Sequence, residues 1–120
     1  MQVRKMNEVP KEAVSSDLFT SDEVTRQTLI PESSDFNASI VGFGKGVRNK
    51  FHHHNSDQIL IVTEGMGKVV TEAGEEVVVS VGDVVFAPAG ETHWHGALGE
   101  STFAHITVTR KGSETTQIEN

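Results

Sequence analysis

The chain has 120 residues, no cysteine and a formal net charge of −7 at neutral pH. This length predicts one domain with its own hydrophobic core, and the absence of cysteine excludes disulfides, thiolate metal ligands and cysteine nucleophiles. The acidic charge and the lack of any basic cluster argue against nucleic acid and anionic membranes as partners. No run of about 18 apolar residues occurs, and the first residues lack the apolar core of a secretory signal peptide, so we expect a cytoplasmic protein.

Short segments rich in β-branched and aromatic residues, separated by turns, predict a single all-β domain over residues 1–120. Residues 1–20 are mixed and polar, and we expect them to form an arm over the barrel or over a neighbouring subunit. The strands predicted after this arm are residues 23–30, 36–43, 47–54, 58–63, 68–71, 76–81, 84–87, 92–97 and 101–109. Residues 64–67 are predicted as a hairpin turn and the last ten residues as a frayed end. No segment has a helical period, so the pattern indicates a β-sandwich or β-barrel.

All six histidines lie between positions 52 and 105, and four of them form two His-x-His pairs. Successive side chains of a strand alternate between its two faces, so His52 and His54 share a face, as do His93 and His95. Buried imidazoles need partners, and packing alone does not explain two such pairs in one small domain. Zinc, manganese, iron, nickel and copper all bind neutral imidazole. The two pairs therefore predict a metal centre rather than a purely structural cluster.

The strongest candidate ligands are His52, His54 and His93. Gln58 can join them if the chain turns back after residues 55–57. The amide of Gln58 would then supply an oxygen beside the imidazole nitrogens.

The other three histidines have less certain roles. The alternation of faces turns His53 away from its two neighbours, so we expect it on the surface or at an interface. His95 is interpreted either as a fourth imidazole ligand or as an acid/base group beside the metal. His105 shares a strand face with Phe103 and Thr107, and its spacing alone fits a hydrogen-bonded core histidine as well as a site residue.

Two segments resemble the sequence motifs of the cupin family, the first at residues 46–65 and the second at residues 82–97. The ligand positions of the family fall on His52, His54, Gln58 and His93. The resemblance implies a small single-domain cupin: a jelly-roll β-barrel with a short N-terminal arm, a metal inside the barrel mouth, and a homodimer or homotetramer. The glutamate ligand of most cupins is replaced here by Gln58. A neutral ligand leaves the charge of a divalent ion uncompensated, which strengthens its Lewis acidity and favours an anionic ligand.

A narrower resemblance is to the bacterial manganese-dependent cupin hydroxynitrile lyases. It rests on His52-x-His54, residues 58–63, residues 82–85, Pro88-x-Gly90-Glu91-x-His93-Trp94-His95-Gly96-Ala97 and His105. This resemblance implies that His95 and His105 are the catalytic histidines beside the substrate. It also implies one divalent metal per chain, manganese first, with zinc, iron or nickel as other candidates.

These features predict a small-molecule enzyme in which a metal Lewis acid and a histidine acid/base reversibly cleave cyanohydrin-like hydroxy compounds. The pocket walls are expected to be apolar, with Val41, Phe43, Ile61 and Phe103 as candidates. One alternative is a metal-dependent dioxygenase or isomerase, which would use the same open metal position. Another is a non-catalytic cupin that binds a small ligand, although the two acid/base histidines favour catalysis.

Overall fold

The computed structural model describes all 120 residues and contains ten β-strands and one 3-10 turn. The elements are η1 (Met6–Glu8), β1 (Glu12–Ala13), β2 (Val24–Thr28), β3 (Phe36–Phe43), β4 (His52–His54), β5 (Gln58–Thr71), β6 (Glu76–Ser80), β7 (Val84–Ala87), β8 (His93–Ala97), β9 (Phe103–Arg110) and β10 (Thr115–Gln117). All pairings between strands are antiparallel. None of the helical residues forms a segment long and apolar enough to cross a membrane. The predicted all-β fold is confirmed.

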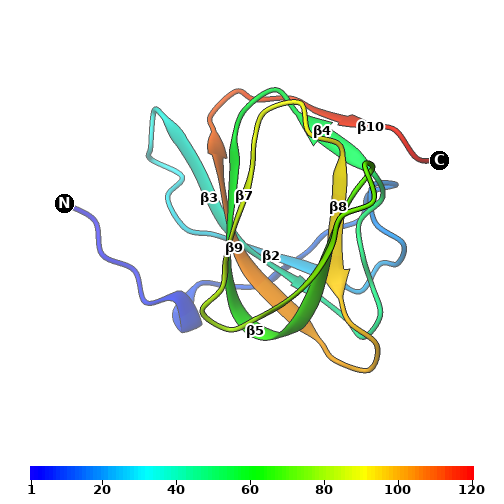
Figure 1. The fold of residues 1–120 in the computed structure, drawn as a ribbon. Helices are drawn as coiled ribbons and strands as arrows, with labels where there is room; N and C mark the ends of the chain where they lie inside the picture. The colour runs from blue at the N-terminus through cyan, green and yellow to red at the C-terminus, as the bar shows by residue number, and fades with distance from the viewer.

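Two sheets curl around a common interior and share β5. The first sheet has the order β1-β2-β3-β9-β5-β7, and the second has the order β10-β4-β8-β5-β6. In Figure 1, β7 and β9 lie on one side of the barrel and β4 and β8 on the other, with β5 curving beneath them. This arrangement places β4 and β8, which carry the two His-x-His pairs, opposite β7 and β9.

The hairpin turn predicted at residues 64–67 is wrong, because β5 runs unbroken through this segment. Its first half pairs with β7 and β9, and its second half pairs with β6 and β8. The ladder with β9 is irregular between Val62 and Glu64, and Gly65 follows with a φ of 68°. A bulge with a left-handed glycine bends a strand sharply without ending it. The bulge and Gly65 therefore let one strand pass from the first sheet into the second.

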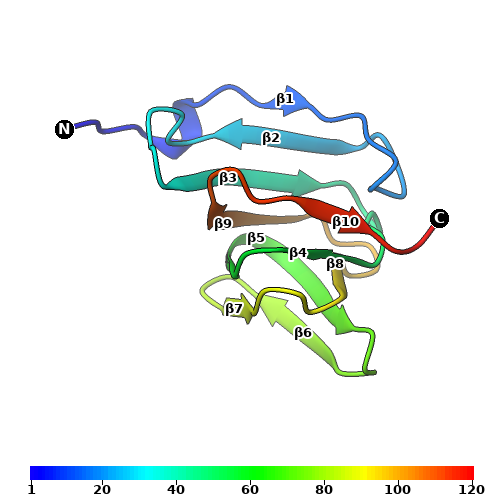
Figure 2. The same ribbon diagram turned by 90° about the horizontal axis from the view of Figure 1, so that it is seen from above.

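The two chain ends are more ordered than their polar sequences suggest. The N-terminal arm is held against the barrel by the buried side chain of Gln27, whose amide donates to the carbonyl oxygens of Met6 and Val9 at 2.9 Å. The prediction that the last ten residues are frayed is wrong, since β10 pairs with β4. Figure 2 shows β10 lying beside β4 across the mouth of the barrel.

The hydrophobic core fills one end of the barrel and supports the histidines at the other. Phe43 and Phe103 stack at 5.9 Å between ring centroids, and Val24 packs against them. Both phenylalanine rings also contact the imidazole of His105, at 5.6 and 5.5 Å between centroids. The residue furthest inside the site is thus fixed by core packing.

Two glycines with positive φ allow the bend in β5 to be tested. A Cβ at Gly65 would collide with the carbonyl oxygen of Thr102, whereas a Cβ at Gly74 would meet nothing within 4 Å. We expect Gly74→Ala to lower the free energy of unfolding by about 1–2 kcal/mol through the left-handed backbone alone. Gly65→Ala should lose a further ~1–3 kcal/mol from overpacking. Denaturant unfolding of both variants measures the difference, and equal losses would contradict the tight approach of β5 to the segment before β9.

Candidate metal centre

Strands of both sheets bring all the predicted site residues to one end of the barrel. His52 and His54 lie on β4, Gln58 begins β5, and His93 pairs directly with His52 across β4 and β8. Two residues further along β8 is His95, and His105 lies on the facing strand β9. His53 lies between His52 and His54 on β4 and does not line the cavity, which agrees with the predicted alternation of side chains.

The imidazole rings of β4 and β8 form a close group. The ring centroid of His52 lies 4.7 Å from that of His93 and 4.9 Å from that of His54. Ligand atoms of the buried residues His52, His93 and His95 all lie within 4.8 Å of one another, so this three-histidine cluster could hold a metal ion. Gln58 completes the group, because its Oε1 lies 3.0 Å from Nε2 of His93.

The orientation of these rings is set through their Nδ1 atoms. Nδ1–H of His52 donates to the carbonyl of Lys50 at 2.6 Å, and Nδ1–H of His93 donates to that of Glu91 at 3.0 Å. Nδ1 of His54 lies 2.9 Å from Oγ1 of Thr115. Hydrogen bonds of this kind fix the tautomer of metal-binding histidines and leave the other nitrogen free for the metal.

Burial keeps the three rings neutral. It lowers the pKa of His52 to about 3 and that of His54 to about 4, and it also lowers the pKa of His93. A neutral ring with hydrogen on Nδ1 carries a lone pair on Nε2. Nε2 of His54 is buried and makes no hydrogen bond of acceptable geometry, although the nearby Gln58 side chain acts to raise the pKa of this ring and buried polar atoms almost always have a partner.

The residues present therefore fit a divalent metal. Nε2 of His93 and Oε1 of Gln58 both hold lone pairs and face each other at 3.0 Å. A cation bound here would be held by both atoms and would also give Nε2 of His54 a partner.

His95 and His105 form a separate pair next to this group. Nδ1 of His95 lies 3.1 Å from Nε2 of His105, and Nδ1 of His105 lies 2.9 Å from Oγ1 of Thr107. Both rings are fully buried, and desolvation lowers the pKa of His105 to about 4 and that of His95 well below its usual value. His105 is therefore in contact with another histidine of the site, and is not merely a packed core residue.

Asn49 determines which nitrogen of each ring in this pair carries hydrogen. Its Oδ1 accepts from the backbone N–H of His95 at 2.8 Å, so its Nδ2 must face Nε2 of His95 at 3.2 Å. Nε2 of His95 then accepts, and Nδ1–H of His95 donates to Nε2 of His105. Sequence analysis missed Asn49, because no spacing rule connects it to residue 95. The bridging of Arg48 to Gly96 and the backbone hydrogen bond from Asn49 to His95 bring the two segments together.

The cavity beside the histidines has a volume of about 410 Å³ and is mostly polar. Of its 16 lining residues, three are hydrophobic: Leu18, Phe19 and Val41. The apolar wall predicted from the sequence is therefore wrong, apart from Val41. Phe43 and Phe103 lie deeper, in the core. His95 lines the cavity, whereas the fully buried His105 lies behind it.

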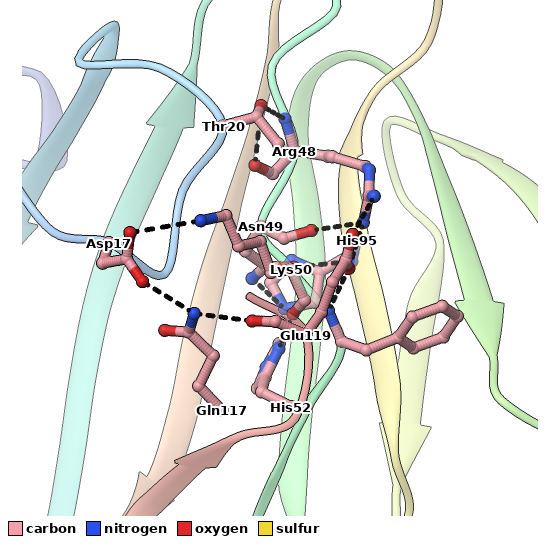
Figure 3. A network of polar contacts seen from close by, with 10 residues as sticks. Asp17, Thr20, Arg48, Asn49, Lys50, His52, His95, Gln117 and Glu119 are labelled. Atoms are coloured by element: carbon pink, nitrogen blue, oxygen red, sulfur yellow. Dashed lines mark hydrogen bonds and ion pairs between the residues drawn. The ribbon is translucent and has the colours of Figure 1, made fainter.

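The chain termini hold the site in place through a polar network (Figure 3). Glu119 accepts two hydrogen bonds from the guanidinium of Arg48 and one from the backbone N–H of Phe51. Gln117 reaches Asp17 of the N-terminal arm, which also pairs with Lys50. These contacts fix the segment that leads into β4, and so the position of His52.

A jelly-roll barrel with a cluster of buried histidines at its mouth defines a class of small β-barrel proteins built around a metal site. The chain belongs to the cupin family, since residues 39–109 match the Cupin domain. A segment of 68 residues is 40% identical to (R)-mandelonitrile lyase from Granulicella tundricola. This match covers 57% of the chain and 52% of the relative, so the chain aligns with about half the length of that enzyme.

Solved structures agree on the fold. A cupin-like protein from Thermotoga maritima is 29% identical, with a TM-score of 0.83 over 90% of this chain and 84% of that chain. The polyketide cyclase RemF from Streptomyces resistomycificus is 20% identical, with a TM-score of 0.88 over 100% of this chain and 87% of that chain. At that level of identity the second likeness supports the fold alone.

Proposed function

We propose that the chain is a mononuclear divalent-metal enzyme that cleaves small hydroxy compounds by a lyase reaction, as the cupin hydroxynitrile lyases do. The observation that carries the proposal is the unpartnered, buried Nε2 of His54 beside a neutral pair of histidines, His95 and His105. The first feature calls for a cation, and the second supplies a base. The partial match to a mandelonitrile lyase supports this reaction type.

The proposed metal ligands are His52, His54, Gln58 and His93. His95 is assigned to catalysis because both its ring nitrogens already have partners, Asn49 and His105, whereas Nε2 of His54 has none. A bound divalent ion would supply Lewis acidity that stabilises negative charge on a substrate oxygen. Manganese is the first candidate, and zinc, iron and nickel bind similar ligands.

The protein's own residues would move the proton. Nε2 of His95, a residue that lines the cavity, would accept the hydroxyl proton of a cyanohydrin in place of the Asn49 amide. The bond between the hydroxyl carbon and the nitrile carbon would break, the nitrile would leave with its electron pair, and the aldehyde would form. His105 would share the positive charge, since Nδ1–H of His95 already donates to its Nε2. Return of the proton would release hydrogen cyanide.

One experiment separates this function from the alternatives. Untagged protein should contain about one equivalent of manganese or zinc and should release cyanide from mandelonitrile without consuming oxygen. Chelation should abolish the activity, and the same metal should restore it. Oxygen uptake with a small diketone would favour a dioxygenase instead. Protein that cannot be loaded with any divalent metal would refute the proposal.

A further inference from the structure

We propose that the natural substrate is a small carboxylate carrying several hydroxyl groups, and that Arg26 binds its carboxylate at the β2 side of the cavity. This inference rests on the proposed metal centre only for the reacting end of the substrate. It concerns the opposite wall of the cavity, formed by β2, β3 and β9, and it takes mandelonitrile as a test compound for the proposed lyase reaction rather than as the natural substrate.

The facing wall becomes steadily more polar from the core to the mouth. Residues directly opposite in antiparallel strands share a face, so the strand register defines successive rows of inward side chains. Each row crosses β2, β3 and β9 in turn. The rows are Val24–Phe43–Phe103, then Arg26–Val41–His105, then Thr28–Ser39–Thr107. Asn37 and Thr109 form the next row on β3 and β9, beyond the end of β2.

The third row presents three hydroxyl groups to the cavity, and all three of its residues line it. Oγ1 of Thr107 already contacts Nδ1 of His105, but a benzene ring lying against this row would leave the hydroxyl groups of Thr28 and Ser39 without partners, which costs binding energy. Hydroxyl groups of a substrate would satisfy them. A site that hydrogen-bonds a substrate hydroxyl strongly rejects analogues that lack this hydroxyl. An apolar pocket discriminates much less between ligands of similar shape.

Charge identifies the remaining group of the substrate. The chain has a net charge of −7, yet none of the 16 residues around the cavity is an aspartate or glutamate. Arg26 is the one arginine or lysine among them, and it takes part in none of the ion pairs of the structure. Glu12 faces it in register across β1 and β2 without forming such a pair. An arginine that forms no ion pair, in a cavity lined by no carboxylate, suits bidentate binding of a substrate carboxylate.

The spacing and volume of the cavity limit the size of the substrate. The backbones at Arg26 and His105 are separated by two strand spacings, with Val41 between them, which is about 10 Å. Arg26 and His95 both line the cavity, whose volume of about 410 Å³ limits the substrate to a small hydroxy acid.

Gluconate and sorbitol test the inference, because they share a hydroxylated six-carbon chain and differ in the carboxylate. Calorimetric titration of zinc-loaded protein should give a Kd for gluconate at least tenfold lower than that for sorbitol. Arg26→Gln should weaken gluconate binding about tenfold and leave sorbitol binding unchanged. Lys45→Gln removes the same charge from an exposed turn outside the cavity and should change neither.

The outcomes are separable from the proposed metal function. Equal binding of gluconate and sorbitol, or gluconate binding unaffected by Arg26→Gln, would overturn the carboxylate site. Tighter binding of mandelate than of gluconate would overturn the inference that the substrate carries several hydroxyl groups. Repeating the titration on metal-free protein isolates the Arg26 contribution: a tenfold loss in Arg26→Gln without metal supports the carboxylate site even if the metal enzyme proposal fails. Metal content, measured on every sample, reports on that proposal alone.

Discussion

His95→Ala is expected to keep its metal and to lose cyanide release from mandelonitrile by about 10²- to 10⁴-fold, the usual contribution of a general base. The reason is the position of the ring, which lines the cavity, accepts a hydrogen bond from Asn49 and donates one to His105, both outside the proposed ligand set. His105→Ala should have a smaller effect on the same reaction. Its ring lies behind His95 and would act by accepting the Nδ1–H hydrogen bond. Steady-state kinetics and metal analysis of each variant measure both quantities.

His53→Ala provides the matched control for these variants. It removes an imidazole from the same domain, but from the face of β4 that points away from the cavity, so both metal content and kcat should match the wild type. If His95→Ala loses its metal, His95 belongs to the ligand set instead. If it keeps both metal and activity, the proposed base is wrong.

The alternation of residues in strands was sufficient to predict much of the site. His52, His54, His93 and His95 share faces of two strands that the fold places next to each other. The turn at Gly65 could not be predicted correctly from local sequence. Glycine at positive φ occurs in hairpin turns and in bulges alike, and only the pairing of β5 with both sheets distinguishes the two.

The contacts that complete the site are non-local and lie outside any motif. Asn49 reaches His95 across 46 positions, and Thr115 reaches His54 across 61. The polar wall was missed for a related reason. The rows across β2, β3 and β9 depend on strand register, and a shift of one residue would turn every side chain to the other face. Arg26 therefore could not be assigned to the cavity before the strand register was known.

The unpartnered nitrogen of His54 leads to the second large effect. His54→Ala should weaken zinc binding by at least about 100-fold, more than the 10- to 100-fold that follows loss of an outer hydrogen bond. Thr115→Val is the graded comparison, because it removes only the partner of Nδ1 and should weaken binding about tenfold. Competition with a chromophoric zinc chelator measures both affinities. Unchanged affinity in His54→Ala, together with loss of zinc in His95→Ala, would place His95 in the ligand set with His52 and His93. In that case the His95 ring would bind the metal and could not also serve as the base. The base proposed for the lyase reaction would then be wrong, and His105 would be the one remaining histidine of the pair able to accept the proton.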